Sequence, residues 1–182
     1  MKILIVSDIH GSAYFAKKIP EILENEKAEK LVLLGDLYYH GPRNPFPKDY
    51  APMEVAEVLN NLKEKLKDNF IAIKGNCDAE VDEMISKFEF KEYYVEKINN
   101  KIMYFTHGHK NNIDKLPDEK VDIMYYGHFH TGFIKEKDRI IFANPGSMSL
   151  PKENTPNSYL LVDENEIILK DVDGNVIDRN NF

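Results

Sequence analysis

The order of apolar and polar residues predicts an alternation of buried strands and amphipathic helices in the first half of the chain. The runs KILIVS and KLVLLG are short and continuously apolar, which is typical of strands that are buried on both faces. Between these runs, apolar residues recur at helical spacing at Ala16, Ile19 and Leu23. Ser12 precedes them and is a residue type that caps helices. The pattern therefore indicates a strand, a helix and a second, parallel strand.

A second helix is predicted further along, followed by a third buried strand. Pro52 suits the first turn of this helix, because the first turn leaves its amide hydrogens unpaired and proline has none. The apolar stripe of the helix consists of Val55, Leu59, Leu62 and Leu66. We expect the apolar residues of PMEVAEVLNNL in the core or in the contact of a homodimer. The run NFIAIKG then supplies the third strand.

The second half of the chain reads as more antiparallel. YYVEKINNKIMYFTH forms two alternating runs around an Asn-Asn turn, and RIIFANPGS and SYLLVDENEIILKDVDGNVI are typical of short strands with tight turns. We therefore expect two sheets with helices outside them, in a single domain that spans residues 1–182. The long irregular piece, residues 38–52, carries four prolines. A loop of this length in a compact domain is more often functional than idle.

Composition and charge narrow the class of protein. The 182 residues are 42% hydrophobic and 30% charged, which is an ordinary globular balance. The net charge of −7 argues against a protein that coats nucleic acid, so nucleic acid enters only as a possible substrate. The single cysteine excludes an intrachain disulfide. The apolar run at the N-terminus is too short for a signal peptide or a membrane span, so we expect a cytoplasmic protein with no membrane partner.

Candidate chemistry collects where the predicted strands end, in the segments SDIH, GDLYYH, GNCD, THGH and GHFH. Ligands of α/β sheets bind beyond the carboxyl ends of the strands. All six histidines fall in these segments: His10, His40, His107, His109, His128 and His130. Because residues two apart in a strand face the same side, we expect Asp8 with His10, and His128 with His130, to point into one pocket. A mixed set of Asp, His and Asn suits Mn²⁺, Zn²⁺ or Fe²⁺ better than Mg²⁺ or Ca²⁺.

The segments DIH, GDLYYHGPRN, GNCD, THGH and GHFH, in this order, resemble the calcineurin-like metallophosphoesterase superfamily, and in particular its small bacterial and archaeal phosphodiesterases. The resemblance covers nearly the whole chain, and the ordered set is far more specific than any one segment. It implies an α/β fold, namely a four-layer α/β/β/α sandwich with two mixed β-sheets. It also implies two divalent metal ions, with Mn²⁺ preferred and Ni²⁺, Zn²⁺ or Fe²⁺ open.

The resemblance further implies a set of metal ligands and a reaction. One ion would be held by Asp8, His10 and His130, the other by Asn76, His107 and His128, and Asp36 would bridge them. Two such ions can polarise a phosphoryl oxygen and lower the pKa of a shared water. The implied function is a two-metal phosphodiesterase in which a metal-bridging hydroxide attacks a small phosphate ester.

Further residues near these segments are candidates for catalysis and substrate binding. We expect catalytic contributions from Asn76, Cys77, Asp78 and His109. Asp78 is expected to cap the helix that follows it and to orient a metal ligand. His109 is expected to contact a metal ligand rather than the metal itself, and to contribute to catalysis through that contact.

Cys77 departs from the family pattern, since much of the superfamily has histidine at this position. A thiol is a weaker proton donor than an imidazolium, so we expect Cys77 to modulate catalysis in favour of leaving groups that need little protonation. Inert packing and direct metal ligation are the alternatives.

The proline-rich loop supplies the candidates for substrate binding. His40 and Arg43 lie in it and are expected to contact phosphate. The motifs do not separate a phosphodiesterase from a phosphomonoesterase or a nucleotide pyrophosphatase. An interpretation of another class is a non-catalytic scaffold that binds protein partners. All the expected ligand positions are intact in this sequence, which argues against such a scaffold.

Overall fold

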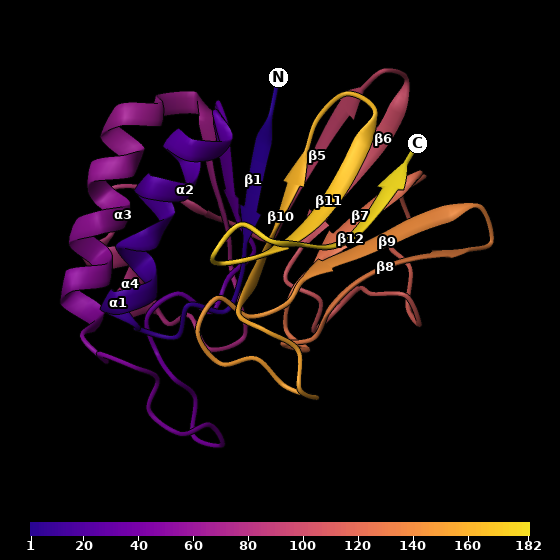
Figure 1. Cartoon of the computed structure of the whole chain (residues 1–182). Helices are drawn as coiled ribbons and strands as arrows, with labels where there is room; N and C mark the ends of the chain where they lie inside the picture. The colour runs from indigo at the N-terminus through magenta and orange to yellow at the C-terminus, as the bar shows by residue number, and fades with distance from the viewer.

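The computed structural model describes residues 1–182 as two β-sheets packed face to face, with helices on the outer side of the first sheet (Figure 1). The first sheet has seven strands in the order β12-β11-β10-β1-β2-β3-β4. Its strands are β1 (Ile3–Val6), β2 (Lys30–Leu33), β3 (Phe70–Ile73), β4 (Phe90–Lys91), β10 (Ser158–Val162), β11 (Glu166–Asp171) and β12 (Val176–Asn181). The strands from β1 to β4 run parallel, and β10 to β12 are antiparallel to their neighbours.

The second sheet has five strands in the order β5-β6-β7-β9-β8 and is also mixed. Its strands are β5 (Tyr93–Ile98), β6 (Lys101–Thr106), β7 (Ile123–Tyr126), β8 (Gly132–Lys137) and β9 (Ile140–Pro145). The helices are α1 (Ala13–Ala16), α2 (Lys18–Glu26), α3 (Pro52–Leu66), the single turn η1 (Lys67–Asn69) and α4 (Glu80–Ile85). The predicted α/β class with two mixed sheets is confirmed.

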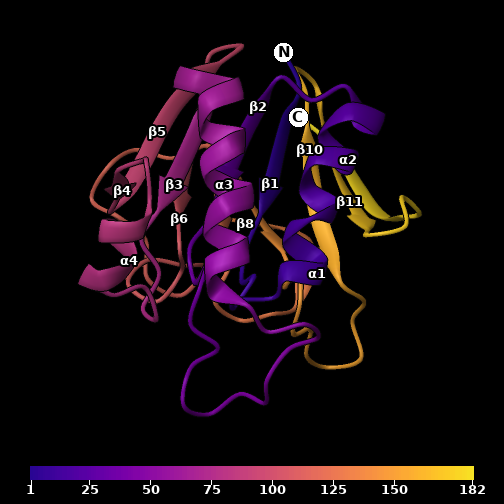
Figure 2. The same ribbon diagram turned by 90° about the vertical axis from the view of Figure 1, so that its left-hand side faces the viewer.

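The continuous apolar runs of β1 and β2 follow from burial on both faces. In β1, Ile3 and Ile5 pack into the core between the two sheets, whereas Leu4 and Val6 pack into the core beneath the helices. Figure 2 shows α3 and the α1–α2 pair lying across this outer face. Because both faces of the strand are covered, neither face carries polar residues.

The helix signals in the sequence mark real boundaries. The side chain of Ser12 accepts a hydrogen bond from the amide of Phe15 at 3.4 Å and so caps α1, as predicted. Pro52 occupies the first turn of α3, also as predicted. The helix expected around Ile19 is broken into α1 and α2 at Lys17. No helix combines the length and the apolar character that a membrane crossing requires.

The outer face of the second sheet differs from the four-layer expectation. All helices precede residue 86, so no helix covers this face. Its core of Tyr104, Met124, Tyr126 and Phe142 is instead closed by Val121 and by Ile113 from the segment 107–122. That segment, HGHKNNIDKLPDEKVD, is rich in turn-forming and charged residues and lacks an apolar stripe at helical spacing. The fourth layer is therefore a loop.

Candidate metal centre

The predicted metal ligands lie in loops at the carboxyl ends of strands from both sheets. Asp8 and His10 follow β1, Asp36 follows β2 and Asn76 follows β3, all in the first sheet. From the second sheet, His107 follows β6, and His128 and His130 follow β7. The structure therefore brings together residues that lie up to 122 positions apart in the sequence, from Asp8 to His130.

Five of these ligands have backbone conformations in the left-handed region, which side chains other than glycine rarely adopt. The φ angles are 56° for Asp8, 51° for His10, 55° for Asp36, 66° for His128 and 62° for His130. Such conformations cost on the order of 1–3 kcal/mol each and cluster at functional sites. The expectation that each Asp-His or His-His pair shares one face of a strand is wrong, because β1 ends at Val6 and β7 at Tyr126.

Backbone hydrogen bonds between neighbouring loops hold these conformations. The amide of Asp8 donates to the carbonyl of Gly35 at 3.1 Å, and the amide of His10 donates to the carbonyl of Asp36 at 2.9 Å. Gly75 is required in the adjoining turn, since a Cβ atom there would collide with the carboxylate and the amide of Asp36. The ligand loops are therefore held in place by main-chain contacts.

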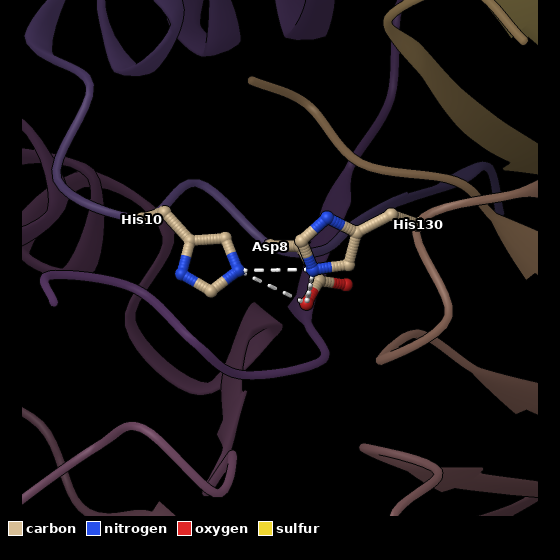
Figure 3. A group of neighbouring side chains, drawn as sticks. All are labelled: Asp8, His10 and His130. Atoms are coloured by element: carbon tan, nitrogen blue, oxygen red, sulfur yellow. Dashed lines mark hydrogen bonds and ion pairs between the residues drawn. The ribbon is translucent and has the colours of Figure 1, made fainter. Parts of the chain in front are cut away.

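Asp8, His10 and His130 form a group that we call the buried cluster, drawn in Figure 3. Its side chains are almost fully inaccessible to solvent. Nε2 of His10 lies 3.5 Å and Nε2 of His130 lies 3.2 Å from Oδ1 of Asp8, and the two Nε2 atoms are 3.1 Å apart. The second oxygen, Oδ2 of Asp8, accepts hydrogen bonds from the Ser7 hydroxyl and the His128 amide. Oδ1 has no hydrogen-bond partner.

Asn76, His107 and His128 form a second group, which we call the open cluster. Nε2 of His107 lies 3.0 Å from Oδ1 of Asn76 and 3.3 Å from Nδ1 of His128. Asp36 lies between the two clusters, with Oδ2 3.4 Å from Nε2 of His107 and 3.8 Å from Nε2 of His10. Asp36 is thus close to one imidazole of each cluster, and its bridging of two ions stays a prediction.

Carbonyl oxygens orient three of the imidazoles. In each case the Nδ1–H donates to a backbone carbonyl at 2.7 Å: His10 to Tyr39, His107 to Leu34 and His130 to Leu150. This hydrogen bond places a ring proton on Nδ1, so in the neutral imidazole, the form that binds metal ions, each Nε2 presents a lone pair to the interior. Two lone pairs 3.1 Å apart beside an unpartnered carboxylate oxygen fit a divalent cation, which would satisfy all three atoms.

The electrostatics of the site favour positive charge. Burial opposes ionisation of Asp8, but the adjacent imidazoles of His10 and His130, which attract the carboxylate when they are protonated, hold its pKa well below the usual range. Burial also opposes ionisation of Asp36, but the hydrogen bond with His107, the charge of His107 when it is protonated and the Cys77 amide together lower the pKa of Asp36. Burial together with the charge of His107 lowers the pKa of His128 to about 4. Two carboxylates and a neutral imidazole are thus available to a metal ion.

Asp78 lies behind the ligands rather than at a helix terminus. Its carboxylate accepts hydrogen bonds from the amides of Asp36 and Leu37, both at 2.8 Å, and from the amide of Gly75 at 2.7 Å. Burial and the nearby charge of Asp36 raise the pKa of Asp78 to about 6. The expectation that Asp78 caps α4 is wrong, since the carboxylate of Asp82 accepts the Ala79 amide there. Asp78 instead fastens the turn that carries Asp36.

Cys77 is half-buried beside the open cluster. Its amide donates to Oδ1 of Asp36 at 2.8 Å, and its sulfur lies 3.4 Å from Nδ2 of Asn76. Burial, and then the charge of Asp36, raise the pKa of the thiol to about 12. The structure thus places Cys77 near the predicted site as a neutral thiol.

The ligands open into a cleft of about 810 Å³. Arg43 lines this cleft, and so does Lys152, a cation that the sequence patterns did not single out. His40 does not line it: its ring packs instead between aromatic rings, with centroids 4.5 Å from Phe46 and 5.3 Å from Tyr50. The predicted contact of His40 with phosphate therefore has no support in this geometry.

His109 lies on the other side of the open cluster. Its ring is exposed, and its centroid is 5.4 Å from that of His107. It lines a separate polar cavity with Lys74, Glu92 and Tyr93 rather than the cleft. His109 therefore lies beside His107 and outside the cleft, and a contribution of His109 to catalysis stays a prediction.

Two packed sheets with carboxylate, imidazole and amide donors at their strand ends define a class, that of metal-dependent phosphoesterases. Residues 1–166 match the calcineurin-like phosphoesterase superfamily domain. The chain is 39% identical over 165 residues to phosphodiesterase YfcE of Escherichia coli K12, a match that covers 90% of this chain and 88% of that protein. The chain therefore belongs to the calcineurin-like phosphoesterase superfamily.

Other relatives and solved structures agree with this assignment. Phosphodiesterase MJ0936 of Methanocaldococcus jannaschii is 25% identical over 155 residues, covering 80% of this chain and 83% of that protein. The structure of the E. coli phosphoesterase YfcE superimposes with a TM-score of 0.93 at 34% identity, over 100% of this chain and 99% of that one. Vps29 of Chaetomium thermophilum shares the fold, with a TM-score of 0.66 at 17% identity over 100% of this chain and 98% of that one.

Proposed function

We propose that this protein is a two-metal phosphodiesterase. The observation that carries the proposal is the pair of donor clusters around Asp36, in which inward-facing lone pairs and the unpartnered Oδ1 of Asp8 converge. Nothing in ordinary packing requires three imidazole Nε2 atoms and two carboxylates to face one another in a buried space. A binding site for cations does require it.

The residues fit two divalent ions, with Mn²⁺ as our preferred metal. We propose that Asp8, His10 and His130 hold one ion, that Asn76, His107 and His128 hold the other, and that Asp36 contacts both. When bound, two such ions polarise a phosphoryl oxygen and lower the pKa of a water. The carbonyls of Tyr39, Leu34 and Leu150 keep the imidazoles in the tautomer that this requires.

The side chains of the cleft account for recognition of the phosphate. Arg43 and Lys152 line it and supply positive charge, although the whole chain has a net charge of −7. Asn76 is exposed to the cleft, where its amide nitrogen can donate to a phosphoryl oxygen while its Oδ1 faces His107. Cys77 borders the same space and brings no charge to it.

A diester is the substrate class that we favour over a monoester or a nucleotide pyrophosphate. The relatives YfcE and MJ0936 are both named phosphodiesterases. The cleft of about 810 Å³ lies within the size range of small-molecule sites. A non-catalytic scaffold is the alternative of another class; the fold also occurs in Vps29, which is named for vacuolar protein sorting rather than for an esterase activity.

The test is hydrolysis of bis(p-nitrophenyl) phosphate beside p-nitrophenyl phosphate. Metal-stripped protein would be assayed with Mn²⁺, Ni²⁺, Zn²⁺ or Mg²⁺ added back, and His128→Ala would serve as the variant with an impaired open cluster. We expect metal-dependent cleavage that favours the diester and is lost in the variant. Preference for the monoester would replace the diesterase assignment with a monoesterase.

Metal binding has to be measured in parallel. Two bound ions without turnover of either ester would favour the scaffold over the enzyme. Absence of metal binding, in protein whose circular dichroism shows a folded chain, would refute the ligand assignment itself.

A further inference from the structure

A smaller cavity of about 240 Å³, which we call the side pocket, adjoins the cleft at Cys77. Tyr39, Cys77 and Ala79 line both spaces. Six of the eight residues that line the side pocket are apolar or aromatic: Tyr38, Tyr39, Tyr50, Pro52, Ala79 and Val81. The other two are Cys77 and Asp82, whose carboxylate accepts the Ala79 amide. The centre of the cleft is polar, whereas the side pocket is mainly apolar.

Two residues of the aromatic wall of the side pocket, Tyr39 and Tyr50, contact the loop that carries the ligand His10. The carbonyl of Tyr39 accepts the Nδ1–H of His10 at 2.7 Å, so its backbone is tied to a ligand while its ring remains 42% exposed. Tyr50 packs closely over Gly11, where a Cβ atom would collide with the ring. The carbonyl of Gly11 also accepts a hydrogen bond from the amide of Ala51 at 2.8 Å. The backbone of Tyr39 and the ring of Tyr50 are therefore held at fixed positions relative to the clusters.

The opposite wall is α4, and its outward residue Val81 is unusual for its position. Val81 is 60% exposed, although Glu80 and Glu83, its neighbours on this short helix, are charged. Asp82 holds the start of the helix by accepting the amide of Ala79 at 2.8 Å. This contact fixes the position of Val81 at the rim of the pocket.

The size of the side pocket limits what it can hold. An apolar cavity of about 150 Å³ accommodates a benzene ring, so about 240 Å³ is enough for one ring with a small substituent. Arg43 and Lys152 line the main cleft and are absent from the side pocket. A substrate that fills both spaces has an anionic centre and a flat apolar arm on the side of Cys77.

We propose that the side pocket is a subsite for a flat, apolar arm of the phosphate ester, and that Tyr39, Tyr50 and Val81 determine this specificity. The inference rests on the proposed function, since it places the phosphoryl group at the metal clusters. It names the substrate class more closely: esters in which one arm is an aryl group or a similar single ring. Esters whose arms are all small alkyl or sugar groups leave the pocket unfilled.

The test uses two simple probes that differ only in this arm, phenylphosphonate and methylphosphonate. Their dissociation constants for the Mn²⁺-loaded protein would be measured by calorimetry, which requires no turnover. We expect phenylphosphonate to bind at least ~10-fold more tightly, because filling an apolar pocket is worth roughly 10- to 200-fold. In Val81→Asp and in Tyr39→Ala the ratio should fall below about threefold, since one wall becomes charged or is removed.

Matched controls separate the subsite from general damage. Met84→Asp changes an apolar residue on the same helix that is 84% exposed and does not line the pocket, so the ratio should stay at the wild-type value. Tyr39→Phe keeps the ring and should also retain the ratio. Methylphosphonate affinity should change less than twofold in Val81→Asp, which shows that the phosphoryl site is intact.

The outcomes distinguish this inference from the proposed function. Equal affinity of the wild-type protein for both probes, or a ratio unaffected by Val81→Asp and Tyr39→Ala, would refute the subsite and leave the diesterase standing. A ratio lost equally in Met84→Asp would also refute it. Binding of neither probe would overturn the proposed function and the subsite with it.

Discussion

The buried and the open cluster lie on either side of one carboxylate, Asp36, but differ in their access to solvent. In the buried cluster, Asp8 and His10 are 0% exposed and His130 is 3% exposed, although His130 borders the cleft. In the open cluster, His107 is buried, but Asn76 is exposed and His128 is partly exposed, and both line the cleft. If both clusters bind ions as proposed, we expect the buried cluster to anchor one ion and the open cluster to present the other to the substrate. Four kinds of substitution test this division, and a fifth serves as a remote reference.

The largest effect is expected from Asp36→Asn, because Asp36 is the carboxylate that both clusters share. Loss of a residue behind a ligand typically costs about 10- to 100-fold in activity, so loss of a shared ligand should cost more than ~100-fold. The bound metal, measured by atomic emission after dialysis, should fall below two ions per chain. Retention of two ions and of more than a tenth of the activity would show that Asp36 does not bridge.

The clusters themselves are compared by His130→Ala and His128→Ala. We expect His130→Ala to remove the tighter of two metal-binding phases in a titration of metal-free protein, since its cluster is buried and oriented by carbonyls. His128→Ala should remove the weaker phase and keep the tighter one. Both should lose activity by more than ~100-fold. Identical titrations of the two variants would erase the distinction between buried and open clusters.

Asp78→Asn tests whether the support behind Asp36 matters to both clusters. An amide can keep some of the three hydrogen bonds but places a donor among the backbone amides that Asp78 accepts from. We expect activity to fall roughly 10- to 100-fold and the affinity of both binding phases to fall together. A change confined to one phase would assign Asp78 to a single cluster.

Cys77→His tests whether residue 77, which lies beside the open cluster, influences protonation of the leaving group. An imidazolium is a better proton donor than a thiol, so the variant should gain roughly tenfold or more on diesters with alkoxide leaving groups. Esters of p-nitrophenol need little protonation and should change only a few-fold. If the wild-type protein and Cys77→His have the same preference between the two leaving groups, Cys77 contributes to packing and does not influence catalysis.

The smallest effect on activity is expected from Glu26→Gln, because Glu26 lies far from both clusters. Glu26 accepts hydrogen bonds from Tyr159 at 2.8 Å and from Lys170 at 2.7 Å, and so ties α2 to the first sheet. Loss of a hydrogen bond to a charged group should lower the free energy of unfolding by roughly 1.5–3 kcal/mol at pH 7. Activity and metal content should not change, which makes the variant a measure of stability alone.

The difference in the free energy of unfolding between the wild-type protein and Glu26→Gln depends on pH, and the sign of this dependence can be derived. Burial works against ionisation, but the contacts with Lys170 and Tyr159 lower the pKa of Glu26 below its ordinary 4.5. The stabilisation is therefore fully present above pH 4.5 and is lost as the pH falls through the lower pKa of the folded state. Urea unfolding of both proteins from pH 7 down to pH 3 should show the curves converging; a constant gap would refute the ion pair as the cause.

Much of the fold and of the site was accessible from the sequence, for identifiable reasons. The strand β1 and the helix α3 were predicted because continuous apolar runs and helical stripes report burial directly. The candidate metal ligands could be proposed because packing alone rarely places acidic and imidazole side chains directly after several buried strands, and the structure brings these side chains together. The homodimer and the single-domain organisation stay predictions.

What the sequence did not reveal depends on contacts between distant segments. The left-handed conformations of Asp8 and His128 arise from bonds between loops, and local pattern rules place both residues on strands. The capping role expected of Asp78 failed because its carboxylate finds three amides in other turns. Lys152 reaches the cleft from the far end of the chain, where no motif marks it.

The origin of the donors in both sheets has a consequence for folding. Asp8, His10, Asp36 and Asn76 belong to the first sheet, and the three remaining histidines belong to the second. Neither sheet alone presents a complete set for either ion, so a chain in which the sheets have not yet docked is a poor metal binder. An ion that binds only the native state stabilises that state by mass action. Metal binding would therefore stabilise the docked arrangement of the two sheets, and its onset during refolding would show that the sheets have docked.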